Sequence, residues 1–236
     1  MNQHFVVSGC GRSGTMFTWR LLNWIGVRTS FEEFFDAQSR ETDCAESYVQ
    51  WLEETGTAGE VSSLSSPHVA NLAEHVTIIH IVRNPVAVIA SLLGGKNFEK
   101  PLVWSKNVKF NFRFAPEMKM TMTPLEMAMT YWLRWNELVE DYADLRVRAE
   151  DLGDSKADTL PALMSTIDSP LDPSLARAAR EHLGTTWNAG NRDQNLRWSR
   201  IPDSIAKRDV CAMAFRFGYS EMDLREHCPH CGMIAS

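Results

Sequence analysis

The chain has 236 residues, of which 44% are hydrophobic and 23% are charged, and its net charge is −6. This length and apolar content are sufficient for one large core, as in a single-domain α/β protein. The acidic balance excludes a chain whose whole surface binds nucleic acid, so we expect no nucleic-acid partner.

The five cysteines show no regular framework spacing, which predicts a reduced environment. A strand is expected within a few residues of the N-terminus, with no signal-peptide pattern before it, and no apolar stretch is long enough to cross a membrane. The sequence therefore predicts a cytoplasmic protein with no membrane partner.

A glycine-rich turn follows the first predicted strand, at about 4–9, and leads into a helix over about 14–26. Its glycines, at positions 9, 11 and 14, let backbone N–H groups approach phosphate oxygens, and the helix N-terminus favours negative charge. Arg12 adds a cation, and Ser13 and Thr15 add hydroxyl groups. This predicts a phosphate site. Because Thr15 stands where a Walker A motif has lysine, ATP hydrolysis is not the first expectation.

Two adjacent carboxylates, Glu32 and Glu33, follow this helix within the aromatic run Thr29-Ser-Phe-Glu-Glu-Phe-Phe35. Flanking aromatic rings can desolvate a carboxylate and raise its pKa into the range of a general base. Alternatively, both side chains face solvent beside a small aromatic core.

The pattern then predicts a helix over 45–54, a strand over 60–64 and a short helix over 67–73. His68 lies in the short helix, directly after a Ser-Ser-Pro run. Its imidazole could assist proton transfer, or it could serve only in packing or helix capping.

A β-branched run over 77–82 predicts a central strand, and Arg83-Asn84-Pro85 leads from it into a helix over 85–93. Proline suits the first turn of a helix, where its missing N–H would lack a partner in any case. Arg83 ends the strand and Ser91 lies two turns into the helix, so both are candidate phosphate ligands. The alternative is a strand-end arginine and a serine that bonds its own helix.

These two motifs resemble those of sulfotransferases that use 3′-phosphoadenosine 5′-phosphosulfate (PAPS). In that family an Arg/Lys-Ser-Gly-Thr loop holds the 5′-phosphosulfate, and Arg-(Asp/Asn)-Pro with a later serine holds the 3′-phosphate. The resemblance covers about residues 4–220. It implies an α/β fold, a three-layer sandwich with a central, mostly parallel sheet like that of P-loop NTPases. It also implies that PAPS, or its product 3′-phosphoadenosine 5′-phosphate (PAP), binds to Gly11, Arg12, Ser13, Gly14, Thr15, Met16, Arg83 and Ser91.

The Glu-Glu-aromatic run resembles that of bacterial carbohydrate-type and tyrosylprotein-type sulfotransferases, in which the second glutamate is the general base. The resemblance therefore assigns the base to Glu33, with Glu32 as an alternative. Arg12 and His68 are further candidate catalytic residues, His68 with packing or helix capping as its alternative role. No metal is required. Many members of the family carry a lysine two residues before the proline that corresponds to Pro67. This chain has Ser65 at that position. Either another cation replaces that lysine, or the transition state is less well neutralised.

Residues 94–123 are expected to form a long loop, an insertion on the acceptor side of the domain. The segment carries six Lys or Arg against two Glu, interleaved with aromatic residues. Such a loop suits a small-molecule or carbohydrate-like hydroxyl acceptor and favours an anionic one. The alternative is a solvated surface loop pinned by a few aromatic side chains.

The rest of the chain predicts a strand over 145–148 and helices over 124–142, 157–166, 173–183 and 202–217. Arg192 and Arg197, in a basic segment before the last helix, are weaker candidates for the 3′-phosphate. Residues 223–236 are expected to form a flexible tail, in which Cys228 and Cys231 do not readily complete a metal site.

We therefore expect one domain over 1–222 that transfers a sulfuryl group from PAPS to a hydroxyl acceptor. A P-loop small-molecule kinase is one alternative, but it would need the Walker lysine and a carboxylate for magnesium. A non-catalytic module that binds PAP or another nucleotide is a second alternative, since it would keep both phosphate motifs.

Overall fold

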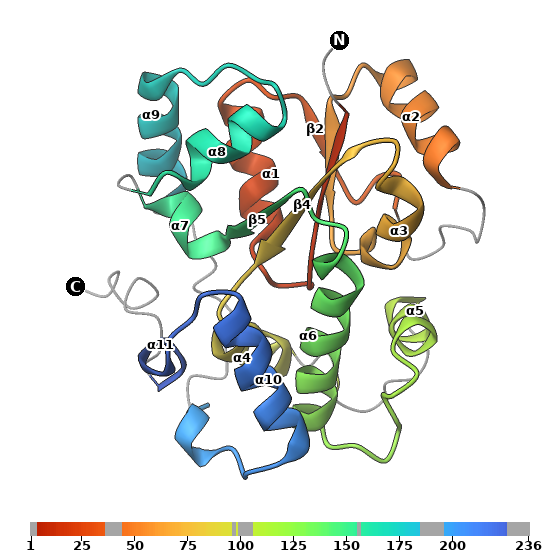
Figure 1. Ribbon diagram of the computed structural model, residues 1–236, viewed down its shortest axis with the longest axis vertical. Helices are drawn as coiled ribbons and strands as arrows, with labels where there is room; N and C mark the ends of the chain where they lie inside the picture. The colour runs from red at the N-terminus through yellow and green to blue at the C-terminus, as the bar shows by residue number, and fades with distance from the viewer. Residues whose placement is uncertain are drawn as a thin grey trace. The chain divides into compact units, whose positions relative to one another are not determined.

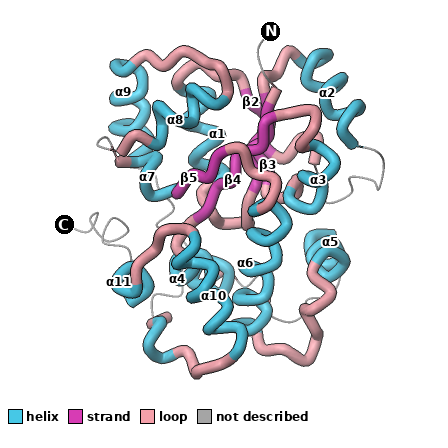
Figure 2. The backbone as a smooth tube through the Cα atoms, viewed as in Figure 1, coloured by secondary structure: helices cyan, strands magenta, loops and turns pink. Residues whose placement is uncertain are grey.

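A computed structural model of the chain describes residues 4–35, 44–95, 98, 106–154, 157–184 and 196–225. The chain divides into two compact units, Met1–Val82 with Asn136–Trp187, and Arg83–Trp135 with Asn188–Ser236. The first, which we call the sheet unit, holds one five-stranded parallel sheet in the order β2-β3-β1-β4-β5 (Figure 2). Its strands are β1 (Phe5–Ser8), β2 (Thr29–Phe31), β3 (Gly59–Ser62), β4 (Thr77–Val82) and β5 (Leu145–Arg148).

Helices cover both faces of this sheet (Figure 1). One face carries α1 (Thr15–Trp24), α7 (Ala149–Gly153), α8 (Thr159–Thr166) and α9 (Pro173–Gly184), and the other carries α2 (Cys44–Thr55), the 3₁₀ turn η1 (Ser66–His68) and α3 (Val69–Leu72). The predicted α/β fold, a three-layer sandwich with a parallel sheet, is therefore confirmed.

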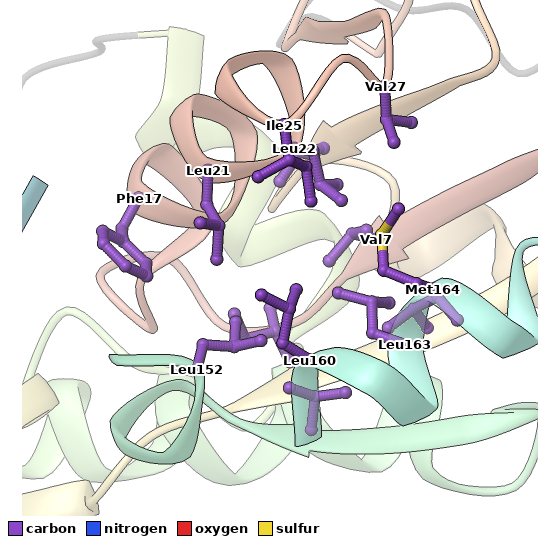
Figure 3. Packing of buried hydrophobic residues seen from close by; sticks show 14 of the residues in the cluster. Val7, Phe17, Leu21, Leu22, Ile25, Val27, Leu152, Leu160, Leu163 and Met164 are labelled. Carbon is purple, nitrogen blue, oxygen red and sulfur yellow. The ribbon is translucent and has the colours of Figure 1, made fainter. Parts of the chain in front are cut away.

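The three central strands β1, β3 and β4 are buried along their whole length, because helices cover both faces of the sheet there. Along β1, the side chains of Phe5 and Val7 join the core on the α1 face, whereas Val6 joins the core on the α2 face. Figure 3 shows the first of these cores, in which side chains of α1 face those of α7 and α8. A continuous apolar run is what a parallel strand covered on both faces requires.

The strand expectations hold, with one omission. Four predicted strands coincide with β1, β3, β4 and β5 to within one or two residues at most ends. The sequence analysis missed β2, which has only three residues, Thr29–Phe31, and lies at the edge of the sheet. Three residues are too few to show a strand periodicity.

The second unit is helical in its described part and contains the clearest departure from expectation. It holds α4 (Pro85–Gly94), α5 (Lys106–Phe114), the first part of α6 (Pro124–Glu140), η2 (Trp198–Arg200), α10 (Ile205–Arg216) and α11 (Glu221–Arg225). The expected loop over 94–123 is wrong in its middle third, because α5 lies there. The rings of Phe110 and Phe114, one turn apart on α5, lie 4.9 Å apart, and Phe110 also packs against Trp135 of α6.

The first glycine of the glycine-rich turn lies against the neighbouring strand. A Cβ atom on Gly9 would lie 2.2 Å from the carbonyl oxygen of Ile81 in β4. We expect Gly9→Ala to destabilise the fold by roughly 1–3 kcal/mol, because the strand would have to shift. Chemical denaturation measures this loss. Gly153→Ala is the matched control, since its Cβ would meet nothing within 4 Å. Equal stability of the two variants would contradict the close approach.

Candidate functional site

The candidate site of the sheet unit is built at the carboxyl edge of the sheet. Because all five strands are parallel, the segments that follow β1, β2 and β3 leave the sheet at the same edge. These segments are the glycine-rich turn, the Glu32–Phe35 segment and the Ser63–His68 segment. Ligands of open parallel sheets bind at this edge.

The glycine-rich turn has the geometry of an anion site. Arg12 has a φ of 72° and Gly14 a φ of 93°, both in the left-handed region, and the Ser13 amide donates to the Cys10 carbonyl at 3.0 Å. Helix α1 starts at Thr15, and its cap residue, Gly14, has no side chain to cap the amides of the first turn. A non-glycine residue in this conformation is uncommon and clusters at ligand sites.

The side chains of this turn fit a phosphate group. The Ser13 side chain is buried, and within the described ranges its Oγ makes no hydrogen bond of good geometry. The Arg12 side chain is exposed at the same turn, as is that of Met16, whereas Thr15 is buried. An unsatisfied buried hydroxyl, an exposed cation and an uncapped helix start are complementary to an oxyanion.

Serine hydroxyl groups connect the turn to the segment after β3. Ser65 Oγ lies 2.8 Å from Ser8 Oγ and 2.7 Å from the Ser62 carbonyl oxygen, and Ser66 Oγ donates to the Gly9 carbonyl at 3.2 Å. The residue at the position of the missing lysine is thus a buried part of the scaffold. It locks two loops together and adds no charge.

The two adjacent glutamates have different surroundings. Glu32 has a φ of 50°, and its Oε1 accepts a hydrogen bond from Ser63 Oγ at 2.8 Å. Glu33 is exposed, so the flanking phenylalanine rings do not desolvate its carboxylate as the sequence analysis expected. Of the two side chains, that of Glu33 is the more exposed, and that of Glu32 is half-buried.

A third glutamate, Glu60 of β3, was missed by the sequence analysis. Its side chain is fully buried, and its Oε1 accepts hydrogen bonds from the amides of Glu33 at 2.6 Å and Phe34 at 3.1 Å. Burial raises the pKa of Glu60 to about 7, the hydrogen bonds from the amides of Glu33, Phe34 and Phe35 act in the opposite direction, and the charge of Glu33 adds to the rise. A glutamate at the start of the strand predicted over 60–64 was the available signal, but its partners are 26 and 27 residues away in sequence.

His68 is buried at the end of η1, where its ring stacks on that of Phe35 with centroids 5.6 Å apart. The ring therefore packs against the segment that carries the two adjacent glutamates. This contact agrees with the packing alternative for His68, and a role in proton transfer stays a prediction.

The candidate ligands of the 3′-phosphate lie in the second unit. Arg83 is buried directly after β4, and Ser91 is half-buried on α4. Asn84 caps α4 by accepting from the Val86 amide at 2.9 Å, and its Nδ2 donates to the Asp223 carbonyl at 2.6 Å. Arg197 is exposed before η2, and Arg192 lies outside the described residues.

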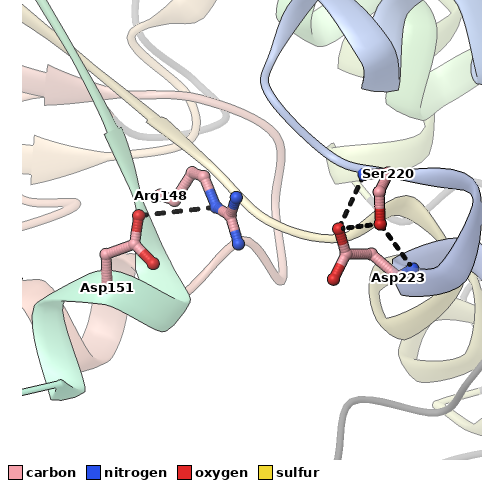
Figure 4. Close-up of polar contacts among 4 residues, drawn as sticks. All are labelled: Arg148, Asp151, Ser220 and Asp223. Atoms are coloured by element: carbon pink, nitrogen blue, oxygen red, sulfur yellow. Dashed lines mark hydrogen bonds and ion pairs between the residues drawn. The ribbon is translucent and has the colours of Figure 1, made fainter.

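Figure 4 shows two local polar contacts, one within each unit. Arg148, which ends β5 in the Arg-Ala-Glu-Asp-Leu run, forms an ion pair with Asp151 at 3.5 Å. Ser220 and Asp223 form a reciprocal cap at the start of α11, with Asp223 Oδ2 accepting from the Ser220 amide at 2.6 Å.

Comparison with known proteins identifies the fold family. A family model described as a sulfotransferase domain matches residues 2–183. Among solved structures, a sulfotransferase domain from the curacin biosynthetic pathway is similar at 12% identity and a TM-score of 0.54, covering 93% of this chain and 99% of that one. A sulfotransferase domain from the Synechococcus PCC 7002 olefin synthase is similar at 14% identity and a TM-score of 0.50, covering 92% and 94%. No curated protein gives a significant match. At these identities the likeness concerns the fold alone.

Within the described ranges, no helix is long and apolar enough to cross a membrane. The same ranges contain no group of three or more His, Cys, Asp or Glu side chains arranged to hold a metal ion.

The buried Glu60 carboxyl predicts a pH dependence of stability. Its pKa is about 7 in the folded chain against 4.5 as the ordinary value, so the folded state holds the proton more tightly. The resulting stabilisation is complete below pH 4.5 and is lost as the pH rises through 7. We expect the free energy of unfolding to fall by roughly 1–3 kcal/mol between pH 5 and pH 8.

Glu60→Gln should remove this part of the pH dependence, because an amide does not titrate. Glu53→Gln is the matched control, since the Glu53 side chain is exposed and is not among the groups that shift the pKa of Glu60. Denaturant titrations at several pH values provide the measurement. If the Glu60→Gln chain keeps the slope of the parent, another group titrates in this window.

Proposed function

The chain belongs to the sulfotransferase family, and on that premise we propose that it transfers a sulfuryl group from PAPS to an acceptor hydroxyl. The observation that supports this function best is the glycine-rich turn. Left-handed Arg12, the buried hydroxyl of Ser13 and the uncapped start of α1 together form a site for an oxyanion.

Two groups of residues would hold the donor. The amides at the start of α1, with Arg12, Ser13 and Thr15, bind the 5′-phosphosulfate. Arg83 and Ser91 bind the 3′-phosphate, and Arg197 and Arg192 assist from the segment before η2. When bound, PAPS supplies the sulfuryl group and leaves as PAP.

Glu33 acts as the general base of this reaction. Its exposed carboxylate takes the proton from the acceptor hydroxyl while the hydroxyl oxygen forms a bond to sulfur and the bond between sulfur and the PAP phosphate oxygen breaks. Arg12 and the α1 amides stabilise the negative charge of the transferring group. The step needs no metal and no redox partner.

The segment over 94–123 is the part of the chain that we assign to the acceptor. Helix α5 lies within it, and the Arg113 guanidinium lies 5.0 Å from the ring centre of Phe114. An arginine held on an aromatic ring suits a small-molecule or carbohydrate-like acceptor, and an anionic one in particular. Within the sulfotransferase family this segment would set acceptor choice.

Product analysis tests the function directly. Purified protein should release PAP from PAPS when a panel of phenolic, aliphatic and sugar alcohols is supplied. Release of ADP from ATP, with no PAP formed, would instead indicate the kinase alternative. Tight PAP binding without turnover on any acceptor would indicate the non-catalytic module.

The assignment of the 3′-phosphate site predicts cofactor selectivity. Arg83→Ala should weaken PAP binding about 10- to 100-fold, since a charge-assisted contact contributes roughly 1.5–3 kcal/mol. Binding of ADP, which lacks the 3′-phosphate, should change little. Calorimetry measures both affinities, and Arg225→Ala is a control at an exposed arginine paired with Glu221. Equal affinities of the parent protein for PAP and ADP would remove this assignment.

The assignment of the base predicts a selective loss of turnover. Glu33→Gln should lower kcat about 10²- to 10⁴-fold and leave PAP affinity near normal, as expected for the loss of a general base. Glu32→Gln is the matched control, because its side-chain oxygen can still accept from Ser63. Steady-state PAP release gives the rates. If the two variants behave alike, the base lies elsewhere, and His68 is the next residue to replace.

A further inference from the structure

We propose that Glu60 is a positioning residue for sulfuryl transfer: its buried carboxyl holds the backbone of the Glu32–Phe35 segment and thereby fixes where the Glu33 carboxylate lies. This inference rests on the proposed role of Glu33 as the base. The proposed role requires no contact between Glu60 and the donor or the acceptor.

The contacts between Glu60 and the segment are short and directed. One carboxyl oxygen, Oε1, accepts from the amides of Glu33 at 2.6 Å and of Phe34 at 3.1 Å. Two other polar contacts of the segment's backbone are longer, at 3.4 Å each, from the Glu32 amide to the Val61 carbonyl and from Ser62 Oγ to the Phe35 carbonyl. The Glu60 carboxyl is therefore the main polar anchor of this backbone.

Aromatic packing holds the same segment from its other end. The Phe34 and Phe35 rings each lie 5.1 Å from the Tyr48 ring of α2, and Phe34 also lies 5.5 Å from Trp51. The backbone amides of Glu33 and Phe34 are thus tied to β3 while the next two side chains are fixed in the core. The Glu33 side chain is left exposed between these anchors.

The position of Glu60 is costly for the fold alone. In the sheet register Glu60 lies between Ser30 of β2 and Val6 of β1, on the face whose core is apolar. Burying a carboxyl in such a place is unfavourable unless it is well hydrogen-bonded. Within the described part of the chain, Oε2 has no hydrogen-bond partner of good geometry, so this carboxyl is compensated through the backbone amides of Glu33, Phe34 and Phe35.

The titratable neighbours of Glu60 come from helix α2 and from the Glu32–Phe35 segment. Tyr48 of α2 accepts from the Glu60 amide at 3.0 Å, and Glu33 lies in the held segment. His68 of η1 is one ring further away, stacked on Phe35. The strand neighbours Ser30 and Val6 do not titrate in the neutral range.

Nuclear magnetic resonance of the full-length protein tests the anchoring without reference to catalysis. The amide protons of Glu33 and Phe34 should shift with pH along one curve, as Glu60 titrates, and should be protected from hydrogen exchange. Glu60→Gln should abolish the shift but keep protection, because its side-chain oxygen still accepts. Glu60→Met should lose protection at these two amides by about 10-fold or more.

Kinetics tests the consequence for the reaction. Glu60→Met should lower kcat about 10- to 100-fold with unchanged PAP affinity, the scale expected when a reacting group is displaced by about 1 Å, and Glu60→Gln should retain most of the rate at neutral pH. Val61→Ala is the matched control, because it removes buried volume from the same strand on the opposite face of the sheet. It should reduce stability without selective loss of kcat.

The outcomes separate the two proposals. Full protection of both amides in Glu60→Met, or a kcat within twofold of the parent, would overturn the role of Glu60. If instead Glu33→Gln stays fully active while Glu60→Met loses protection and turnover, the segment is positioned by Glu60 and the assignment of Glu33 as base is wrong.

Discussion

The parallel register of the sheet is the constraint on which the rest of this structure depends. Parallel neighbours cannot be joined by a tight turn, so the chain must cross back over a face of the sheet after each strand, and helices such as α1 and α2 cover those faces. The same register places the ends of β1, β2 and β3 at one edge. The parallel register alone therefore brings loops that are distant in sequence to the same edge of the sheet.

At that edge the backbone is held in conformations that are costly by themselves. Among the described residues other than glycine, Arg12, Glu32 and Asp168 have positive φ, and the first two follow strands of the sheet. Each such residue costs on the order of 1–3 kcal/mol. The hydroxyl groups of Ser8, Ser65 and Ser66 are hydrogen-bonded to one another and hold the adjacent loops in place. Because these groups are neutral, they do so without burying a charge.

The sequence predicted those parts of the molecule whose signals are local. The strand, glycine-rich turn and helix over 4–26 could be recognised because their residues are contiguous. Helix α5 was missed because Phe110, Phe112 and Phe114 alternate in a way that does not suggest a helix, although two of these rings meet one turn apart. Glu60 was missed because its hydrogen-bond partners, the amides of Glu33 and Phe34, are 27 and 26 residues away in sequence. A single glutamate at the start of a predicted strand reads equally well as a solvated side chain.

The replacement of the family's lysine by Ser65 changes how charge is handled in the sheet unit. A buried serine that bonds its neighbours contributes no positive potential, so the cationic side chain of the glycine-rich turn is Arg12, aided by the dipoles of the α1 amides. Fixed amide dipoles stabilise a negative charge only when they point at it, whereas a flexible lysine side chain can move toward the charge. In the proposed mechanism, such a site requires that the base, Glu33, also be held accurately. In that proposal the buried Glu60 carboxyl is the second fixed point, because it ties the segment carrying Glu33 to β3, the strand paired with β1.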